Sequence, residues 1–387
     1  MSRLVLNCGY VPLADSAPLI VAQELGYAAD EGLALNLLRQ PSWAALRDLL
    51  ALGHLDAAHI LAPLPVAMSL GLSGRKVATD ILMMLSAGGI VLGVSAALAD
   101  AMRVQGWDND MADPRGARAA LEAAAGGRRL RVGVPFPYAM HHLLFRYLAQ
   151  GTGLAFEAVT TPPPLMAQAV QDGDLDVFVV GEPWGSVAVD SGAGELILPG
   201  SAIWQGAPEK ALAVRHEWVE ADMGRAGALM RALYRAAEWL DTPGNRALAI
   251  EILARTEHLD LSHQALDPSL TGRIVARRGA APTELGQFLR FHRGAATFPW
   301  RSQAAWIGAQ IAALHGRDAG AMARDSMSVP RPDLYRDVIA GMGGDMPGAS
   351  AKLEGAMQHR TAVASMRGDM ILGPDAFFDG RIYEMPS

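Results

Sequence analysis

The sequence contains very little cysteine and lysine. Its one cysteine, Cys8 in LVLNCGYVPL, excludes an intramolecular disulfide, a redox pair and a cysteine zinc site. We expect Cys8 to be a small buried side chain at the end of a first strand. Only three lysines stand among the 33 basic residues. Lys210, in the segment IWQGAPEKALAV, is therefore a candidate for a compact positive charge that the function needs, with a solvated helix start as the alternative.

An excess of positive charge is also missing. The formal net charge is -7, with 40 acidic against 33 basic residues. A nucleic-acid-binding protein usually carries a basic face, so we predict no direct binding of nucleic acid. A local pocket of hydrogen-bond donors can oppose the net charge, which keeps a small acceptor-rich ligand among the alternatives.

Signatures of catalysis and of metal binding are missing as well. The chain has no GxSxG elbow, no Walker loop, no HExxH and no GxGxxG after a strand. His141 and His142, adjacent in VPFPYAMHHLLFRYL, project about 100° apart on a helix and cannot both face one metal ion. We predict a protein that is not an enzyme and holds no metal or cofactor. An enzyme with one of these histidines as its base is the alternative from another class.

The chain begins without a charged leader or an apolar segment of signal length, which predicts a cytoplasmic protein, or a periplasmic one if a signal was removed. Residues 81–99, ILMMLSAGGIVLGVSAALA, carry no charge and are nearly long enough to cross a bilayer. The Ser-Ala-Gly-Gly interruption divides them into two halves of strand length. We therefore predict two buried strands, or a strand and a helix, rather than a membrane span.

Strand-like and helix-like segments alternate twice along the chain. The stretch GHLDAAHILAPLP in the first series has a counterpart of the same pattern, GDLDVFVVGEPW, in the second. A polar segment, residues 105–129, lies between them. Such alternation predicts two α/β lobes with mostly parallel sheets. Ligands of open α/β sheets bind at the carboxyl ends of the strands, so we expect the ligand between the two lobes.

Several polar side chains follow predicted strands. Ser42 and Trp43 open a helix, where free backbone N–H groups and the helix dipole attract anions, and the indole N–H can only donate. Core packing of Trp43 with Ser42 as a helix cap explains the same pattern. Glu182, in VVGEPW, could brace donors, accept from a protonated ligand or cap the next helix.

Six stretches, in one order along nearly the whole chain, resemble a known family. They are GYVPLADSAPLIVAQELGY, PSWAALRDLLALGHLDAAHILAPLPVAMSLGL, FPYAMHHLLFRYLA, GEPWGSVAV, IWQGAPEKALAV and FPWRSQAAWI. Together they resemble the nitrate- and bicarbonate-binding solute receptors of ABC transporters. The resemblance implies the two-lobed periplasmic-binding-protein fold of type II, with residues 1–95 and 200–387 in the first lobe and 96–199 in the second. It also implies a small inorganic oxyanion held between the lobes.

The resemblance places Trp43, His141 and Lys210 around that anion. The family usually has an amide donor where this chain reads SAGGI, so Ser86 and Gly88 would supply a hydroxyl and a backbone N–H. His142, one position beyond His141, is expected to pack or cap. The predicted binding residues, taken together, are Ser42, Trp43, Ser86, Gly88, His141, Glu182 and Lys210.

The start of the chain decides between two roles within this family. Without a leader it is similar to the family's cytoplasmic branch, the NasS-type nitrate and nitrite sensors. That similarity implies a sensor of nitrate assimilation whose partner is an antiterminator-type regulatory protein. The alternative is the solute-binding component of an ABC transporter for nitrate, bicarbonate or a sulfonate, with a membrane permease as its partner.

Overall fold

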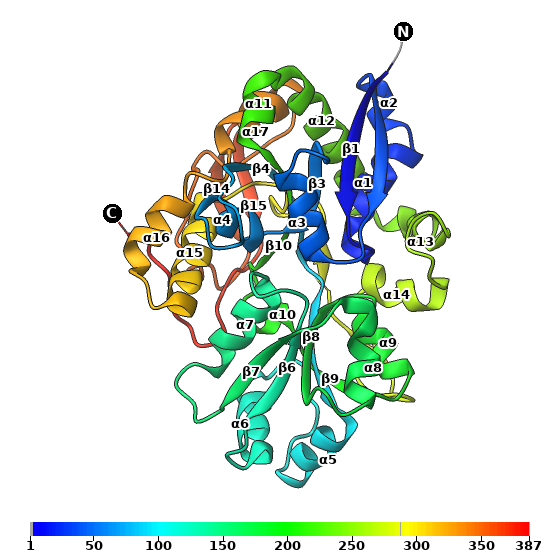
Figure 1. Cartoon of the computed structure of the whole chain (residues 1–387), viewed down its shortest axis with the longest axis vertical. Coiled ribbons are helices and arrows are strands. Elements are labelled where there is room, and N and C mark those ends of the chain that lie inside the picture. Colours follow the sequence, from blue (N-terminus) through cyan, green and yellow to red (C-terminus); the bar gives the residue numbers. More distant parts are fainter. Residues whose placement is uncertain (1–2, 287, 387) are drawn as a thin grey trace.

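The computed structural model describes residues 3–286 and 288–386 and arranges them in two α/β lobes, drawn one above the other in Figure 1. The first lobe contains a six-stranded sheet in the order β13-β4-β10-β3-β1-β2. The second lobe contains a five-stranded sheet in the order β7-β6-β8-β5-β9. The predicted two-lobed α/β fold is thereby confirmed.

The strands of each sheet come from separate parts of the chain. The first sheet consists of β1 (Leu4–Tyr10), β2 (Leu33–Arg39), β3 (Ala57–Leu61), β4 (Thr79–Gly88), β10 (Pro208–Arg215) and β13 (Leu289–Arg290). The second sheet consists of β5 (Ile90–Ser95), β6 (Leu130–Val134), β7 (Phe156–Thr160), β8 (Val177–Gly181) and β9 (Gly194–Pro199). Two small hairpins lie outside them, β11 (Arg273–Ile274) with β12 (Thr283–Glu284), and β14 (Thr361–Ser365) with β15 (Gly368–Leu372).

The helices cover the faces of both sheets. In chain order they are α1 (Ala17–Glu24), α2 (Tyr27–Asp30), α3 (Trp43–Ala51), α4 (Pro63–Ser69), α5 (Ala96–Val104), α6 (Pro114–Ala125), α7 (Met140–Ala149), α8 (Met166–Gln171) and α9 (Trp184–Asp190). They continue with α10 (Gly200–Ile203), α11 (His216–Ala221), α12 (Met223–Leu240), α13 (Arg246–Ala254), α14 (His263–Thr271), α15 (Arg301–His315), α16 (Ala319–Ser326) and α17 (Pro332–Gly341).

Both sheets are mixed, which corrects the prediction of mostly parallel ones. Strand β1 pairs in parallel with β2 and β3, and β6 with β7 and β8. By contrast, β10 runs antiparallel to β3 and β4, and β5 runs antiparallel to β8 and β9. The local βαβ units therefore follow the predicted pattern. The exceptions are β5 and β10, by which the chain enters a sheet from the other lobe, and the short strand β13, which is antiparallel to β4.

The chain first crosses between the lobes at two glycines. Strand β4 ends at Gly88 and β5 begins at Ile90 in the other sheet. Gly88 and Gly89 have φ of 79° and 81°, a left-handed conformation that glycine adopts without steric penalty. The uncharged run 81–99 thus forms two strands and the start of α5, and the crossing lies at Gly89 rather than after residue 95. No helix within residues 3–286 and 288–386 is long and apolar enough to cross a membrane.

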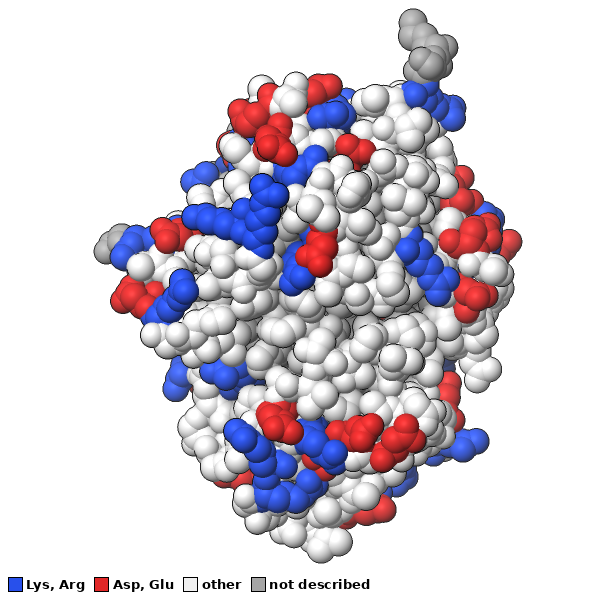
Figure 2. All heavy atoms as spheres, viewed as in Figure 1, with Lys and Arg blue, Asp and Glu red and all other residues white. Residues whose placement is uncertain are grey.

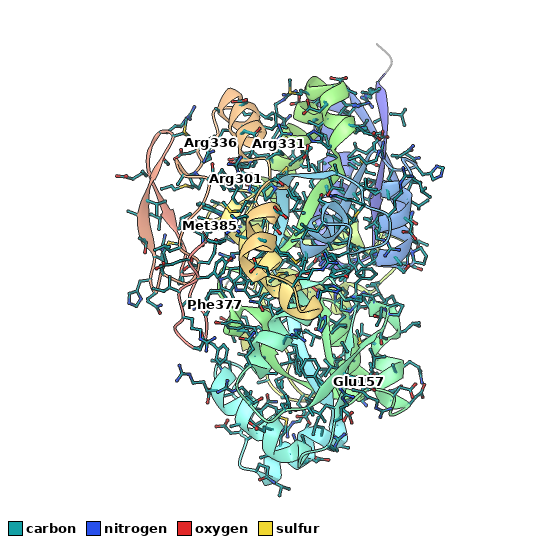
Figure 3. All side chains as sticks on the ribbon, turned by 60° about the vertical axis from the view of Figure 1, so that its left-hand side comes forward. Glu157, Arg301, Arg331, Arg336, Phe377 and Met385 are labelled. Atoms are coloured by element: carbon teal, nitrogen blue, oxygen red, sulfur yellow. The ribbon has the colours of Figure 1, made fainter. Side chains whose placement is uncertain are left out.

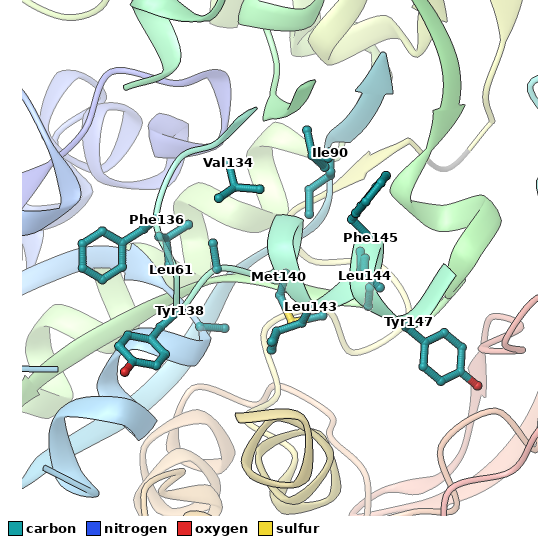
Figure 4. Close-up of a cluster of buried hydrophobic side chains, with 14 of the residues drawn as sticks. Leu61, Ile90, Val134, Phe136, Tyr138, Met140, Leu143, Leu144, Phe145 and Tyr147 are labelled. Carbon is teal, nitrogen blue, oxygen red and sulfur yellow. The ribbon is translucent and has the colours of Figure 1, made fainter. Parts of the chain in front are cut away.

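Helix α7 of the second lobe anchors the core at the level where the lobes meet. Its residues Met140, Leu143, Leu144 and Phe145 are all buried, and Figure 4 shows them beside Leu61 and Ile90 from the strands. This packing buries the first turn of α7, which carries the two adjacent histidines. The position of those histidines is therefore fixed by the apolar face of the helix.

The C-terminal tail packs against both lobes through one aromatic side chain, labelled in Figure 3. The ring of Phe377 stacks on Trp204 with 4.8 Å between centroids. It lies 5.1 Å from the Tyr147 ring of α7 and 5.9 Å from the Trp306 ring of α15. The tail is therefore part of the folded core.

We expect Phe377→Ala to lower the free energy of unfolding by about 3–4 kcal/mol, because it leaves a cavity among three aromatic rings. Urea unfolding followed by tryptophan fluorescence measures this change. Ile382→Ala is the matched control in the same tail, since Ile382 is 51% exposed and should change stability by less than about 0.5 kcal/mol. Equal effects of the two variants would contradict the docking of the tail.

Candidate functional site

Lys210 lies at the centre of a buried group of charges between the two lobes. It belongs to β10, where its neighbours across the sheet are Leu61 of β3 and Ser86 of β4. The side chain is 0% exposed. Its ammonium nitrogen is 2.7 Å from Asp15 Oδ2 and also pairs with Glu209. Lys210 is thus a strand residue held in a salt bridge, not a solvated helix start.

Two carboxylates share this single ammonium. Burial alone would raise the pKa of Asp15, but the Lys210 charge and the nearby His59 ring together hold it below its ordinary value. Burial raises the pKa of Glu209 to about 7, because Lys210 offsets the burial only in part and Asp15 repels the second negative charge. The pKa of Lys210 is raised, since its two carboxylate partners outweigh burial. Lys210 and Asp15 are therefore charged at neutral pH, and Glu209 titrates close to it.

Two aromatic rings complete the first lobe's side of the group. Trp43 opens α3, and its ring centroid lies 5.4 Å from the Lys210 nitrogen, within the range of a cation–π contact. His59 of β3 lies beside it, with 6.3 Å between ring centroids. His59 Nε2 is 3.2 Å from Asp15 Oδ1, and burial lowers the pKa of this histidine.

The second lobe contributes His141, in the first turn of α7. His141 Nδ1 lies 3.5 Å from Glu209 Oε1, so the two lobes meet at this pair. Burial first, and then the nearby Lys210 charge, hold the pKa of His141 well below its usual range. The imidazole is therefore neutral near pH 7, with one N–H donor and one acceptor nitrogen.

These side chains form what we call the interlobe cluster: Asp15, Trp43, His59, Ser86, His141, Glu209 and Lys210. None is more than 3% exposed. Eight of their polar atoms have no hydrogen-bond partner among the described residues, namely Asp15 Oδ1, Trp43 Nε1, His59 Nδ1 and Nε2, Ser86 Oγ, His141 Nδ1 and Nε2, and Glu209 Oε2. Buried polar atoms are normally paired, so this concentration indicates a place for a small polar ligand.

The lobes close around the cluster through hydrogen bonds between them. Trp184 Nε1 of the second lobe donates to the Pro12 carbonyl at 3.1 Å, and the Ala14 N–H donates to the Glu182 carbonyl at 3.1 Å. Tyr138, just before α7, donates to the Leu72 carbonyl at 2.6 Å. On the face shown in Figure 2, a largely uncharged band crosses the middle of the molecule, with most of the charged side chains above and below it. The charges of the cluster are therefore enclosed.

Four of the predicted binding residues, Trp43, Ser86, His141 and Lys210, come together in this cluster. The other three lie at element ends. The Ser42 hydroxyl accepts from the Ala45 N–H at 3.2 Å and so caps α3, and Gly88 ends β4 at the crossing between lobes. Neither arrangement excludes a contact of these two residues with a ligand.

Glu182 has a structural partner of its own. Its Oε2 accepts from the Ser186 N–H at 3.0 Å and its Oε1 from the Ser186 hydroxyl at 3.1 Å, at the start of α9. Burial raises the pKa of Glu182 to about 7. Of the three roles predicted for it, the structure therefore shows the cap. His142, the neighbour of His141, lies 2.9 Å through its Nδ1 from the Pro137 carbonyl, as expected of a packing residue.

Sequence reasoning missed Asp15, His59 and Glu209. The segment ADSAPL is typical of the start of a helix, where Asp15 would serve as a cap, but its carboxylate turns inward to Lys210, and the Ser16 hydroxyl donates to the Leu13 carbonyl. The sequence nevertheless contained an indication of two of these residues. His59 and Glu209 each stand in a segment of otherwise buried residues, AAHIL and PEKALAV, where an ionisable side chain needs a partner.

Comparison with known proteins identifies the family of this chain. The model of the NMT1-like family matches residues 4–254. The chain belongs to the NMT1-like family. That match covers both sheets except β13 and includes every member of the interlobe cluster.

Two similar curated proteins are named for nitrate binding and nitrate import. The chain is 31% identical over 315 residues to the nitrate/nitrite binding protein NrtA of Synechococcus elongatus, covering 78% of this chain and 70% of the relative. It is 30% identical over 352 residues to the nitrate import ATP-binding protein NrtC of Synechocystis, covering 89% of this chain. This member of the NMT1-like family spans about half the length of NrtC, since only 51% of that relative is covered.

A solved structure supports the fold. The crystal structure of the periplasmic nitrate-binding protein NrtA from Synechocystis superimposes with a TM-score of 0.82, over 99% of this chain and 96% of the other. The two sequences are 24% identical in this superposition. The two-lobed binding-protein architecture predicted for this NMT1-like chain is thereby confirmed.

Proposed function

We propose that this protein binds a small planar oxyanion, with nitrate as the first ligand to test, in the interlobe cluster. One observation carries the proposal: three unpartnered hydrogen-bonding atoms, Trp43 Nε1, Ser86 Oγ and His141 Nε2, belong to the same cluster as a fully buried ammonium where the lobes meet. Nitrate has three acceptor oxygens and no donor, so it would complete hydrogen bonds with such atoms. The relatives named as nitrate-binding proteins support the same ligand class.

Binding would be coupled to closure of the lobes. Trp43, Ser86 and Lys210 come from the first lobe and His141 from the second, so only the closed arrangement offers the anion all four. A ligand shifts a conformational equilibrium by its difference in affinity for the two states. The anion would thus stabilise the contacts of Trp184 and Tyr138 across the junction. The proposed role is binding and release of the anion without chemical change.

For the biological role, we favour the solute-binding component of an ABC-type import system over a cytoplasmic sensor. The relatives include proteins named for nitrate import. A sensor with an antiterminator-type partner remains a prediction from the resemblance alone. Deletion of the gene distinguishes them: lost nitrate uptake with normal gene induction supports transport, and normal uptake with altered induction of nitrate assimilation supports sensing. Cell fractionation tests the cytoplasmic or periplasmic location in the same strains.

Titration calorimetry with nitrate, nitrite and bicarbonate on the wild type and Trp43→Phe tests the ligand site. The phenylalanine keeps an aromatic ring beside Lys210 and removes one N–H donor. We expect the Kd for nitrate to rise about 10- to 100-fold, because a hydrogen bond to a charged group contributes about 1.5–3 kcal/mol.

Trp107→Phe is the matched control. Trp107 is also buried with an unpartnered Nε1 among the described residues, but it lies between α5 and α6, at the far end of the second lobe (Figure 1). Its change should leave the Kd unaltered. Equal Kd values for the wild type and Trp43→Phe would remove Trp43 from the site, and no binding of any of the three anions to the wild type would overturn the proposal.

A further inference from the structure

The interlobe cluster carries more negative charge than an anion site should. With both carboxyls ionised, Asp15 and Glu209 outweigh the one ammonium of Lys210, and the two histidines are neutral. A nitrate ion would add a further negative charge to a group of side chains that is shielded from water. Buried charge without a counter-charge is strongly unfavourable. One negative charge must therefore be removed when the anion binds.

Glu209 is placed to lose that charge. Its Oε1 faces Lys210 and His141, while its Oε2 is buried with no hydrogen-bond partner among the described residues. Asp15, by contrast, is held by Lys210 on one oxygen and faces His59 on the other. The ionisable groups of the cluster come from four elements. They are Asp15 from the turn before α1, His59 from β3, Glu209 and Lys210 from β10, and His141 from α7. Among the described residues two carboxyl oxygens of the cluster have no hydrogen-bond partner, Asp15 Oδ1 and Glu209 Oε2. Asp15 Oδ1 faces His59 Nε2 at 3.2 Å, which leaves Glu209 Oε2 as the oxygen that can carry a proton toward a ligand.

Building on the proposed function, we propose that nitrate binds together with one proton, which Glu209 carries on Oε2 and donates as a hydrogen bond to the anion. The proton comes from the solvent, and no covalent bond of the ligand changes. The pKa of Glu209, about 7, fits a group that takes up this proton near neutral pH.

This arrangement makes Glu209 a specificity-determining residue. Nitrate has no hydrogen and needs the protonated carboxyl as a donor. Bicarbonate has a hydroxyl of its own, which can donate to the ionised carboxylate, so it would bind without an added proton. The two anions are then distinguished by pH: nitrate is favoured below neutral pH, and the preference weakens above it.

Calorimetry in two buffers of different ionisation enthalpy measures the proton count directly. For the wild type at about pH 8.5 we expect uptake of about one proton per nitrate. The affinity for nitrate should fall about 30-fold between about pH 6 and about pH 8.5, the factor for one group that titrates near pH 7. Below pH 6 Glu209 is already protonated, so the uptake should disappear.

Glu209→Gln supplies a permanent amide donor at the same place. We expect it to bind nitrate at about pH 8.5 as tightly as the wild type does at about pH 6, without proton uptake. Glu354→Gln is the matched control, because Glu354 is another fully buried carboxyl that pairs with a lysine, Lys352, beside a second carboxyl, Asp375. It should keep the proton uptake of the wild type.

Three results would overturn the inference: nitrate binding by the wild type without proton uptake, uptake that persists in Glu209→Gln, or uptake that is lost in Glu354→Gln. The wild-type proton count needs no variant, so the test survives if Glu209→Gln does not fold. A wild type that binds nitrate at no pH would instead contradict the proposed function itself.

Discussion

Lys210→Met is expected to abolish nitrate binding, with a loss of affinity of at least about 100-fold. It should also lower the free energy of unfolding by about 3–5 kcal/mol, because it leaves Asp15 and Glu209 buried without their cation. Calorimetry and urea unfolding measure the two effects. The loss of stability should grow as the pH rises from about 5 to about 8: without Lys210 both carboxyls have raised pKa values in the folded state, so the folded protein binds more protons than the unfolded chain.

Lys352→Met is the natural control for this change. Two of the chain's three lysines are each paired with two carboxylates, Lys210 between the lobes and Lys352 with Glu354 and Asp375. Both variants should destabilise the protein, and only Lys210→Met should affect the affinity for nitrate. Nitrate binding that survives in Lys210→Met, or that fails equally in Lys352→Met, would remove Lys210 from the site.

Gly181→Val is expected to hold the lobes apart and weaken nitrate binding about 10- to 100-fold. Gly181 ends β8, and a Cβ there would lie 2.7 Å from Leu13 Cδ2 of the first lobe and 3.7 Å from His141 Nε2. Leu13 can move away only if the contact between the closed lobes is disrupted, and overpacking of this kind costs about 1–3 kcal/mol. Because the closed state alone is destabilised, each lobe should remain folded. Small-angle scattering should show a larger radius of gyration, and calorimetry the weaker binding.

Gly341→Val controls for the added side chain. Gly341 is exposed at the end of α17, and a Cβ there has no other heavy atom within 4 Å. This variant should match the wild type in both measurements. If Gly181→Val binds nitrate as tightly as Gly341→Val, then closure around the cluster is not needed for binding.

The fold could be predicted where it depends on local sequence. The alternation that gives β1, β2 and β3 with their helices is visible within a few tens of residues, and so is its repetition in β6, β7 and β8. The antiparallel strands β5 and β10 could not be predicted this way. Their direction depends on the chain crossing from one lobe to the other, which no short pattern records.

The candidate site could likewise be predicted only in part from the sequence. Trp43, His141 and Lys210 were predicted because the resemblance placed them around an anion, and Ser86 because it stands where the family has an amide. Asp15 was missed because its partner Lys210 is 195 positions away and because its place just before a helix is typical of a cap. The excess of carboxylates over ammonium groups is a property of the folded cluster, and the proton-linked binding that we infer follows from it.

A crystal structure grown with nitrate at about pH 6 tests the central claim most directly. The account predicts a planar anion among the cluster, with its oxygens within hydrogen-bond distance of Trp43 Nε1, Ser86 Oγ and His141 Nε2. A separate cavity of about 40 Å³, lined by Arg290 and Lys352, offers positive charge elsewhere in the molecule. Nitrate bound in that cavity, with the interlobe cluster unchanged, would contradict the account.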